Sequence, residues 1–348
     1  MPPGQGERVT SPVTATSPRA ASPPKDPKDP KDPKGSKAPG GLPPLRRIPL
    51  RVRLRNNWVM LALMAPGLLF FAVFFYVPML GNIVAFQDYQ PFIGFKESPL
   101  VGLANFQETF ADPAFWESVR NTLAFAALQL IFFFPAPLAL ALLINSLVST
   151  RVKKFVQSVV YLPHFISWVL VVALFQQVLG GAGLISNFLR DQGLSPLDVM
   201  DDPSTFPMLI TAQVIWKDIG WGMIIYLAAL ANVDQSLYES AAVDGAGRWR
   251  RMWHITLPAV RGVTVMLLVL RLGDVLSVGF EQFLLQRDAV GARAAEVLDT
   301  YVYYHGVVYG DWGIGAAAGL VKGVVGALMI WGANRLAHAF GEQGVYSK

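Results

Sequence analysis

Cysteine is absent from the 348-residue chain, which excludes disulfides and thiolate metal sites. Charged residues are also scarce, at 15% of the chain, whereas soluble domains average about 25%. The few histidines are dispersed, and no two have the i, i+4 spacing of a helical metal site: they are His164, His254, His305 and His338. We therefore expect neither a metal centre nor a single soluble core.

The sequence also lacks the machinery of an enzyme. No G-x-x-x-x-G-K-[ST] segment occurs, so the chain has no phosphate-binding loop of its own and is not expected to hydrolyse ATP. No catalytic constellation is visible either. His164, in "YLPHFISW", has no serine elbow or acid nearby in the sequence, and we expect it to pack or to line a cavity.

Apolar residues are abundant, at 53% of the chain. A bilayer core of roughly 30 Å is crossed by about 20 apolar residues in a helix. Six stretches reach this length: 58–80, 122–147, 155–179, 208–230, 263–285 and 313–337. The sequence therefore predicts an all-α membrane protein with six transmembrane helices, kinked at internal prolines that neighbouring helices tolerate.

The N-terminal tail, residues 1–45, differs from the rest. It repeats a Lys-Asp-Pro triplet in "PKDPKDPKDPKGSK" and has almost no aliphatic residues to bury. Such a composition predicts a disordered cytoplasmic arm. No apolar region of a secretory signal follows within the first thirty residues. Residues 46–348 are expected to form one six-span domain.

Lysine and arginine cluster in alternate connections between the spans. They precede the first span and lie between the second and third and between the fourth and fifth: Arg46, Arg47, Arg51, Arg53, Arg55, Arg151, Lys153, Lys154, Arg248, Arg250, Arg251 and Arg261. Basic loops stay inside, so both termini and segment 232–260 are predicted to be cytoplasmic. The net charge of +5 has the same origin, and no nucleic-acid partner is expected.

The cytoplasmic segment "ESAAVDGAGRWRRMWHITLP", residues 239–258, predicts a helix–turn–helix elbow. Asp234 is a plausible N-cap of the first helix. Gly245 and Gly247 are expected to end it, because glycine takes the left-handed turn readily. The second helix places Trp249, Met252 and Trp253 on one face, predicted to pack against the membrane domain, and Pro258 is expected to stop it before the fifth span.

This spacing resembles the EAA loop of permease subunits in binding-protein-dependent ABC importers. The matching positions are Glu239, Ser240, Ala241, Gly245, Ile255, Leu257 and Pro258. Ser240 departs from the family's alanine but stays small. The resemblance implies that the elbow sits in a cleft of a cytoplasmic ATPase, and that Glu239 and Asp244 face basic residues of that partner.

Most of residues 56–340 resembles the multiple-sugar and polysaccharide branch of this family, for example in "NNWVMLALMAPGLLFFAVFFYVPMLGNIVAFQDYQPF" and "IWKDIGWGMIIYLAALANVD". The resemblance implies the type I importer fold in a bacterial inner membrane. It also implies a second permease of similar fold, an ATPase dimer that holds ATP and magnesium, and an extracytoplasmic sugar-binding protein on the outer loops. No cofactor is expected on this chain.

Ionisable residues inside the predicted spans cost roughly 3 kcal/mol each on insertion scales, so they should face a partner or a cavity. Arg271, Asp274 and Glu281 are predicted to share one helical face, with Arg271 and Asp274 able to neutralise each other. The alternative is an aromatic-lined sugar passage. Its candidates are Trp216, Lys217, Asp218, Trp221, Tyr226, Arg271, Asp274, Glu281 and Lys322, with Lys217 and Lys322 as counter-charges if the sugar is a uronate.

Two other classes of protein remain open on the sequence. An ion-coupled secondary transporter would show inverted repeats and paired broken helices, and no clear internal repeat is visible. A membrane enzyme needs a clustered nucleophile, base or metal site. The sequence identifies neither the sugar nor the subunit that holds it.

Overall fold

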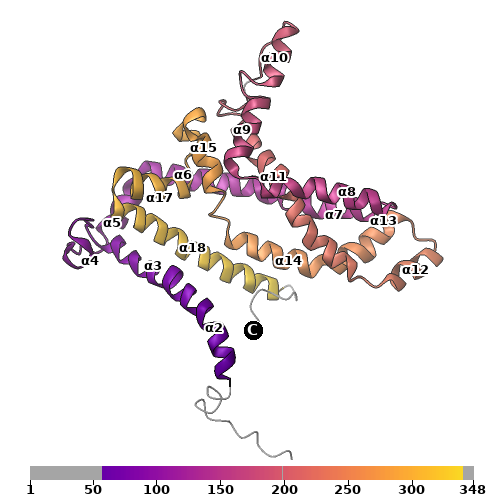
Figure 1. Ribbon diagram of the computed structural model, residues 1–348, viewed down its shortest axis with the longest axis horizontal. Helices are drawn as coiled ribbons and strands as arrows, with labels where there is room; N and C mark the ends of the chain where they lie inside the picture. Colours follow the sequence, from indigo (N-terminus) through magenta and orange to yellow (C-terminus); the bar gives the residue numbers. More distant parts are fainter. Residues whose placement is uncertain (1–56, 198, 340–348) are drawn as a thin grey trace, which may run out of the picture. The chain divides into compact units, whose positions relative to one another are not determined.

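The computed structural model describes residues 57–197 and 199–339, so the predicted tail of residues 1–45 lies outside the described residues. The regular elements in this part are helices, and the only β-pairing there is an isolated bridge between Gln87 and Leu100 (Figure 1). Six of the described helical stretches are long and apolar enough to cross a membrane: Trp58–Phe86, Pro113–Asn145, Trp168–Asp191, Phe206–Ala231, Arg248–Gly273 and Trp312–Ala339. The predicted class and number of spans are confirmed.

Most spans are composite rather than single α-helices. The elements up to the second span are α2 (Trp58–Phe71), η1 (Ala72–Tyr76), α3 (Val77–Leu80), η2 (Gly81–Phe86), α4 (Gly94–Glu97), α5 (Ala104–Ala111), α6 (Pro113–Leu128), η3 (Gln129–Phe133) and α7 (Ala136–Asn145). The next are α8 (Thr150–Tyr161), η4 (Leu162–Phe165), α9 (Trp168–Leu179), α10 (Leu184–Asp191), α11 (Phe206–Ala231) and α12 (Gln235–Val243). The last are α13 (Arg248–Arg251), η5 (Met252–Thr256), α14 (Leu257–Gly273), α15 (Phe280–Val290), α16 (Ala292–Ala295), α17 (Leu298–Tyr303), η6 (Tyr304–Tyr309) and α18 (Trp312–Ala339).

Three of the spans contain a π-helical turn directly before a proline. In each, the residue before the proline donates its N–H five residues back: Val77 to Ala72, Phe134 to Gln129 and Leu257 to Met252. Proline lacks an N–H, and its ring clashes with the carbonyl four residues earlier in an α-helix. A wider turn moves that carbonyl aside, so the helix continues through the proline.

Pro258 therefore does not stop the second arm of the elbow, contrary to the prediction. Helix α13, η5 and α14 run on as one stretch from Arg248 to Gly273. The π-turn η5 absorbs the proline, and the elbow continues directly into the fifth span.

The second span begins earlier than predicted, at Pro113 instead of residue 122. Asp112 caps it, because its side chain accepts the N–H of Ala114 at 2.9 Å, and proline suits the first helical position. The third span begins later, at Trp168 instead of residue 155. Pro163 lies in the 3₁₀ turn η4, and Ile166 is extended, so the chain breaks there.

The fifth span ends at Gly273, although the apolar run continues to residue 285. Gly279, with φ of +121°, lies in the connection to α15. This break separates Glu281 from Arg271 and from Asp274, which is the C-cap of α14. The prediction that the three side chains share one helical face is therefore wrong for Glu281.

Span four supplies the centre of the packed bundle. Helix α11 packs against α7, α8 and α14. Its second half joins a hydrophobic cluster of Ala141, Ile144, Met223, Tyr226, Leu230 and Val260. Its first half joins a second cluster that includes Phe125, Phe206, Ile210 and Phe283. Span four is thereby fixed by side chains from the second span, the fifth span and α15.

Candidate functional site: elbow and polar spans

The first arm of the elbow is α12, which follows span four after a short connection (Figure 1). Asp234 caps it as predicted, accepting the N–H of Ser236 at 2.9 Å. This hydrogen bond lowers the pKa of the Asp234 carboxyl below its ordinary value. Negative charge at a helix N-terminus also stabilises the helix, so α12 starts at a defined residue.

The first arm ends in a two-bond glycine cap. The N–H of Ala246 donates to the carbonyl of Ala241 at 2.8 Å, and the N–H of Gly245 donates to that of Ala242 at 3.1 Å. Gly245 has φ of +71°, the left-handed conformation that this cap requires. The predicted role of Gly245 is confirmed, whereas Gly247, with φ of −68°, begins the second arm instead of ending the first.

The predicted elbow residues divide between the two arms. Glu239, Ser240 and Ala241 lie on α12, with Asp244 as its C-cap. Ile255 lies in η5, and Leu257 and Pro258 begin α14. A hydrogen bond joins the arms, because Tyr238 Oη lies 3.0 Å from Oγ1 of the buried Thr256. This hydrogen bond links α12 directly to the second arm, next to the start of α14.

Most side chains of the elbow are exposed in the described chain. No residue of α12 is buried, and Glu239, Ser240 and Asp244 are exposed. On the second arm, Trp249 is 73% exposed and Trp253 62%. The prediction that these two indoles pack against the membrane domain is therefore wrong within the described chain.

Lys217 binds the break in the chain that precedes the third span. Its Nζ donates to the carbonyls of His164 at 2.8 Å and of Ile166 at 2.6 Å, and the side chain is buried. The 3₁₀ turn and the extended Ile166 leave these carbonyls without helical partners, and an ammonium group satisfies both. A cation deep in span four thus stabilises a broken helix.

Asp218, the next residue, reaches the same segment. Its Oδ1 lies 2.8 Å from His164 Nδ1, and both side chains keep somewhat under a third of their surface exposed. The His164 ring stacks on Trp221 with centroids 4.7 Å apart and planes 12° apart. Tyr161 lies nearly parallel to both rings, with its centroid 6.0 Å from that of Trp221. The result is a half-exposed aromatic surface with an acid and an imidazole beside it.

Gly220 permits this close approach. A Cβ at this position would lie 2.3 Å from the carbonyl oxygen of Val160, on the backbone of α8. Only glycine lets the two backbones lie so near each other. The contact brings Lys217, Asp218 and Trp221 onto η4.

Two other predicted passage residues of span four lie apart from this surface. Trp216 is 36% exposed and packs edge-on against Phe175, with centroids 5.8 Å apart. Tyr226 is 1% exposed and belongs to the hydrophobic cluster described above. Packing accounts for the position of Tyr226, so its assignment to a passage is wrong in this structure.

Of the remaining ionisable candidates, Arg271 and Lys322 are bound by other parts of the chain. The Arg271 guanidinium donates to Gln129 Oε1, in the π-turn η3. Asp274 and Glu281 are exposed, beyond the end of α14. Lys322 donates to Asp299 of α17 in a half-buried ion pair. The counter-charge that Lys322 was predicted to offer is therefore neutralised within the protein.

Sequence reasoning did not find several of the polar contacts. Gln213 of span four meets Gln282 and Gln286 of α15 through buried amide hydrogen bonds of 2.8 to 3.1 Å. The glutamine pair at i, i+4 in "FEQFLLQ" was an available signal, because such a pair lies on one helical face. For His164, the available signal was Pro163, which breaks the helix around it.

Six apolar spans, with breaks in some of the helices and an exposed elbow between spans four and five, are the architecture of a membrane permease subunit. Comparison with known families agrees. Residues 133–340, more than half of the chain, match the model described as "binding-protein-dependent transport system inner membrane component". The chain belongs to this family of ABC-importer permeases.

Individual relatives are similar over most of their length. Protein LplB of Bacillus subtilis strain 168 is 44% identical over 84% of this chain and 92% of its own. The polygalacturonan/rhamnogalacturonan transport system permease protein YteP of the same strain is 45% identical over 86% of this chain and 94% of its own. A chain of a bacterial alginate ABC transporter, solved in complex with an alginate pentasaccharide-bound periplasmic protein, superimposes with a TM-score of 0.78, at 36% identity, over 85% of this chain and 99% of its own.

Proposed function

We propose that the chain is a permease subunit of an ATP-driven importer of acidic oligosaccharides and that the elbow couples it to a separate ATPase. The substrate class is supported by the names of its relatives, since polygalacturonan and alginate are both acidic polysaccharides. The coupling is supported by one observation: α12 buries no residue on its own chain, yet Tyr238 ties it to span five.

A docked ATPase would move α12 as a unit, because its cap at Asp234 and its glycine cap at Gly245 are both well formed. The hydrogen bond between Tyr238 and Thr256 passes that movement to the second arm. Since Arg248–Gly273 is one continuous stretch, the movement reaches Arg271, whose partner Gln129 lies in span two. A movement of the elbow thus displaces residues in the interior of the bundle.

The full transporter requires partners that supply the rest of the cycle. They are a second permease of similar fold, an ATPase dimer holding ATP and magnesium, and a sugar-binding protein. The relative solved with a periplasmic binding protein supports the last of these. Alternating access then follows from two states of the bundle whose equilibrium the ATPase biases.

The sugar would pass the half-exposed aromatic surface of Tyr161, His164 and Trp221. Flat rings suit the C–H faces of a pyranose, and Asp218 offers an acceptor for hydroxyl groups. Lys217 already donates to two carbonyls, so it orders this surface from behind.

Charge reversal at Glu239 tests the coupling. In the reconstituted complex we expect Glu239→Lys to lower ATP-dependent uptake at least about tenfold while the unfolding temperature stays unchanged, since an exposed side chain of α12 is altered. Arg151→Glu, a charge reversal at an exposed residue of α8 outside the elbow, serves as the control and should transport normally. Wild-type uptake by Glu239→Lys would contradict the coupling, and uptake without any ATPase would favour an ion-coupled transporter.

The absence of cysteine makes the predicted orientation directly testable. Val243 is 89% exposed on α12, so Val243→Cys places a unique thiol on the elbow. We expect a membrane-impermeant maleimide to label it in inverted membrane vesicles and not in intact cells. Labelling in intact cells would place the elbow outside and end the proposal.

A further inference from the structure

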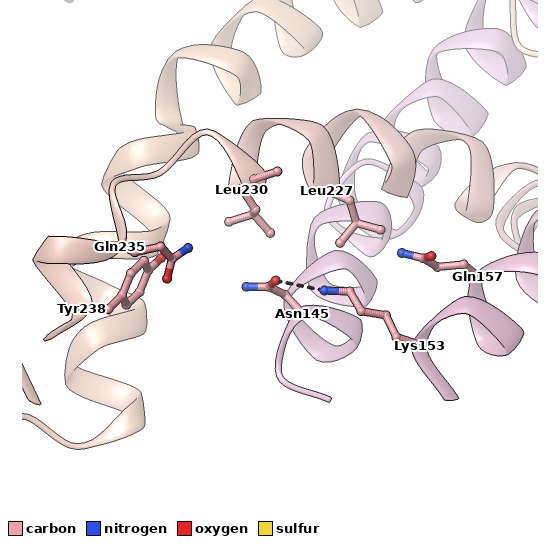
Figure 2. Close-up of a pocket in the computed structure, with 8 residues that line it drawn as sticks. Asn145, Lys153, Gln157, Leu227, Leu230, Gln235 and Tyr238 are labelled. Atoms are coloured by element: carbon pink, nitrogen blue, oxygen red, sulfur yellow. Dashed lines mark hydrogen bonds between the residues drawn. The ribbon is translucent and has the colours of Figure 1, made fainter. Parts of the chain in front are cut away.

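A cavity of about 650 Å³ lies beside the elbow (Figure 2). Its walls come from the end of α7, from α8, from the end of α11 and from the start of α12. Cavities of roughly 300–1,000 Å³ are typical of small-molecule sites. This cavity is lined by α7, α8 and α11 of the bundle and by α12, the arm of the elbow that is proposed to move.

One side of the cavity carries a single positive charge. Lys153 of α8 is the one charged residue among the eight that line it, and none is acidic. Its Nζ donates to Asn145 Oδ1 at 3.3 Å, a long hydrogen bond (Figure 2). A lysine without a carboxylate partner favours an anionic ligand group.

The same walls offer further polar groups. The side-chain amides of Gln157 and Gln235 point into the space from opposite ends (Figure 2) and form no hydrogen bond within the described chain. Tyr238 adds a phenol that is already engaged with Thr256. Amides and a phenol both donate and accept, which suits hydroxyl groups.

An apolar wall completes the lining. Leu227 and Leu230, at the end of span four, face Asn145 and Lys153 across the cavity (Figure 2), and Ala231 also lines it. One positive charge, two uncommitted amides and an apolar wall together fit a ring that has a carboxylate, hydroxyls and a C–H face.

We infer that this cavity binds a short uronate, a monosaccharide or disaccharide with one carboxylate, and that the bound uronate restrains the elbow. The inference rests on the proposed function in two respects: the cytoplasmic location of the cavity and the acidic nature of the imported sugar. Such a molecule would be a hydrolysis product of the imported oligosaccharide, and its accumulation would slow further import.

The restraint follows from where the lining residues lie. Lys153 and Asn145 belong to the bundle, whereas Gln235 and Tyr238 belong to α12. A ligand that bridges the two groups stabilises one position of α12 relative to the bundle. Binding to one state shifts the equilibrium toward it, and the effect on coupling is reciprocal.

Equilibrium dialysis of the full chain with its partner subunits in nanodiscs tests the binding. The probes are galacturonate, the neutral galactose and inorganic phosphate. We expect galacturonate to bind, and Lys153→Gln to weaken it about tenfold or more, because a charge-assisted hydrogen bond is lost. Lys154→Gln, at the exposed neighbour that does not line the cavity, should bind as the wild type does.

Galactose binding as tightly as galacturonate would overturn the assignment to an acid. Phosphate binding as tightly would indicate a general anion site, such as one for a lipid headgroup, and would also overturn it. Equal weakening by Lys153→Gln and Lys154→Gln would place the ligand elsewhere on the surface.

The restraint of the elbow by bound galacturonate is tested by measuring ATPase activity. We expect galacturonate to lower the ATPase activity of the wild-type complex severalfold and to leave Lys153→Gln unaffected. Unchanged activity in the galacturonate-bound wild type would overturn the restraint. Because dialysis needs no transport, a complex that binds galacturonate but imports no acidic oligosaccharide would disprove the proposed function and leave the cavity site standing.

Discussion

Span four and the first arm of the elbow are neighbours in the chain but differ in how many of their residues are buried by the rest of the protein. Helix α11 buries eleven residues, Lys217 among them, and packs against α6, η3, α7, α8, η4 and α14. Helix α12, which begins at Gln235, buries none. The position of α11 is therefore fixed by burial within this chain, whereas α12 is tied to the second arm by the hydrogen bond between Tyr238 and Thr256.

The polar groups of the two helices differ in the same way. Lys217 donates to two backbone carbonyls, and Gln213 is bonded to two other glutamines. On α12, the exposed Glu239 has no such partner in the described chain. A buried polar group must find its partner in the fold, so substitutions in α11 should affect stability and those at exposed positions of α12 should affect coupling.

The largest loss of stability is expected at Gly220. An added methyl group would lie 2.3 Å from the carbonyl oxygen of Val160, a backbone atom that cannot rotate away. We expect Gly220→Ala to cost about 3 kcal/mol, at the upper end for overpacking. The measurement is thermal unfolding in detergent.

Gly323→Ala is the matched control, since Gly323 is also helical and a Cβ there meets nothing within 4 Å. It should be neutral or slightly stabilising. Equal unfolding temperatures for the two variants would contradict the close approach of α11 to α8.

A smaller loss is expected at Lys217. Lys217→Met keeps the length and apolar stem but leaves the carbonyls of His164 and Ile166 without a donor. We expect about 2 kcal/mol, because unsatisfied buried carbonyls cost about 1–3 kcal/mol. The exposed Lys96→Met should unfold as the wild type does. A stability unchanged by Lys217→Met would mean that water replaces the ammonium group and that η4 does not depend on it.

The sequence predicted the features that depend on local pattern. Six apolar runs gave the six spans, and the spacing of Asp234 and Gly245 gave both ends of α12. These features follow from residues within one turn or one helix. Capping and glycine conformations need no knowledge of the rest of the fold.

The sequence could not predict contacts that depend on breaks in the helices. The partners of Lys217 are carbonyls some fifty residues away, and they are free only because the chain is extended at Ile166. The break after Gly273 interrupts a continuous apolar run, so hydrophobicity alone extended the predicted span to residue 285, past Glu281. Burial of Trp249 was predicted from one helical face, but no other part of the described chain covers that face.

The smallest effect, and the sharpest test of the contrast, is expected at the two glycines of the elbow turn. Gly245 has φ of +71° and Gly247 has φ of −68°, and a Cβ at either meets nothing within 4 Å. Crowding is therefore the same, and only the backbone conformation differs. We expect Gly245→Ala to cost about 1 kcal/mol, because a left-handed conformation disfavours a Cβ, and Gly247→Ala to cost less than half of that. Unfolding of both elbow variants at the wild-type temperature would contradict the expected cost at Gly245. If Gly245→Ala alone then loses uptake, the glycine cap serves coupling and not folding. A loss of stability at Gly245 as large as that at Gly220 would show instead that the elbow is part of the packed bundle.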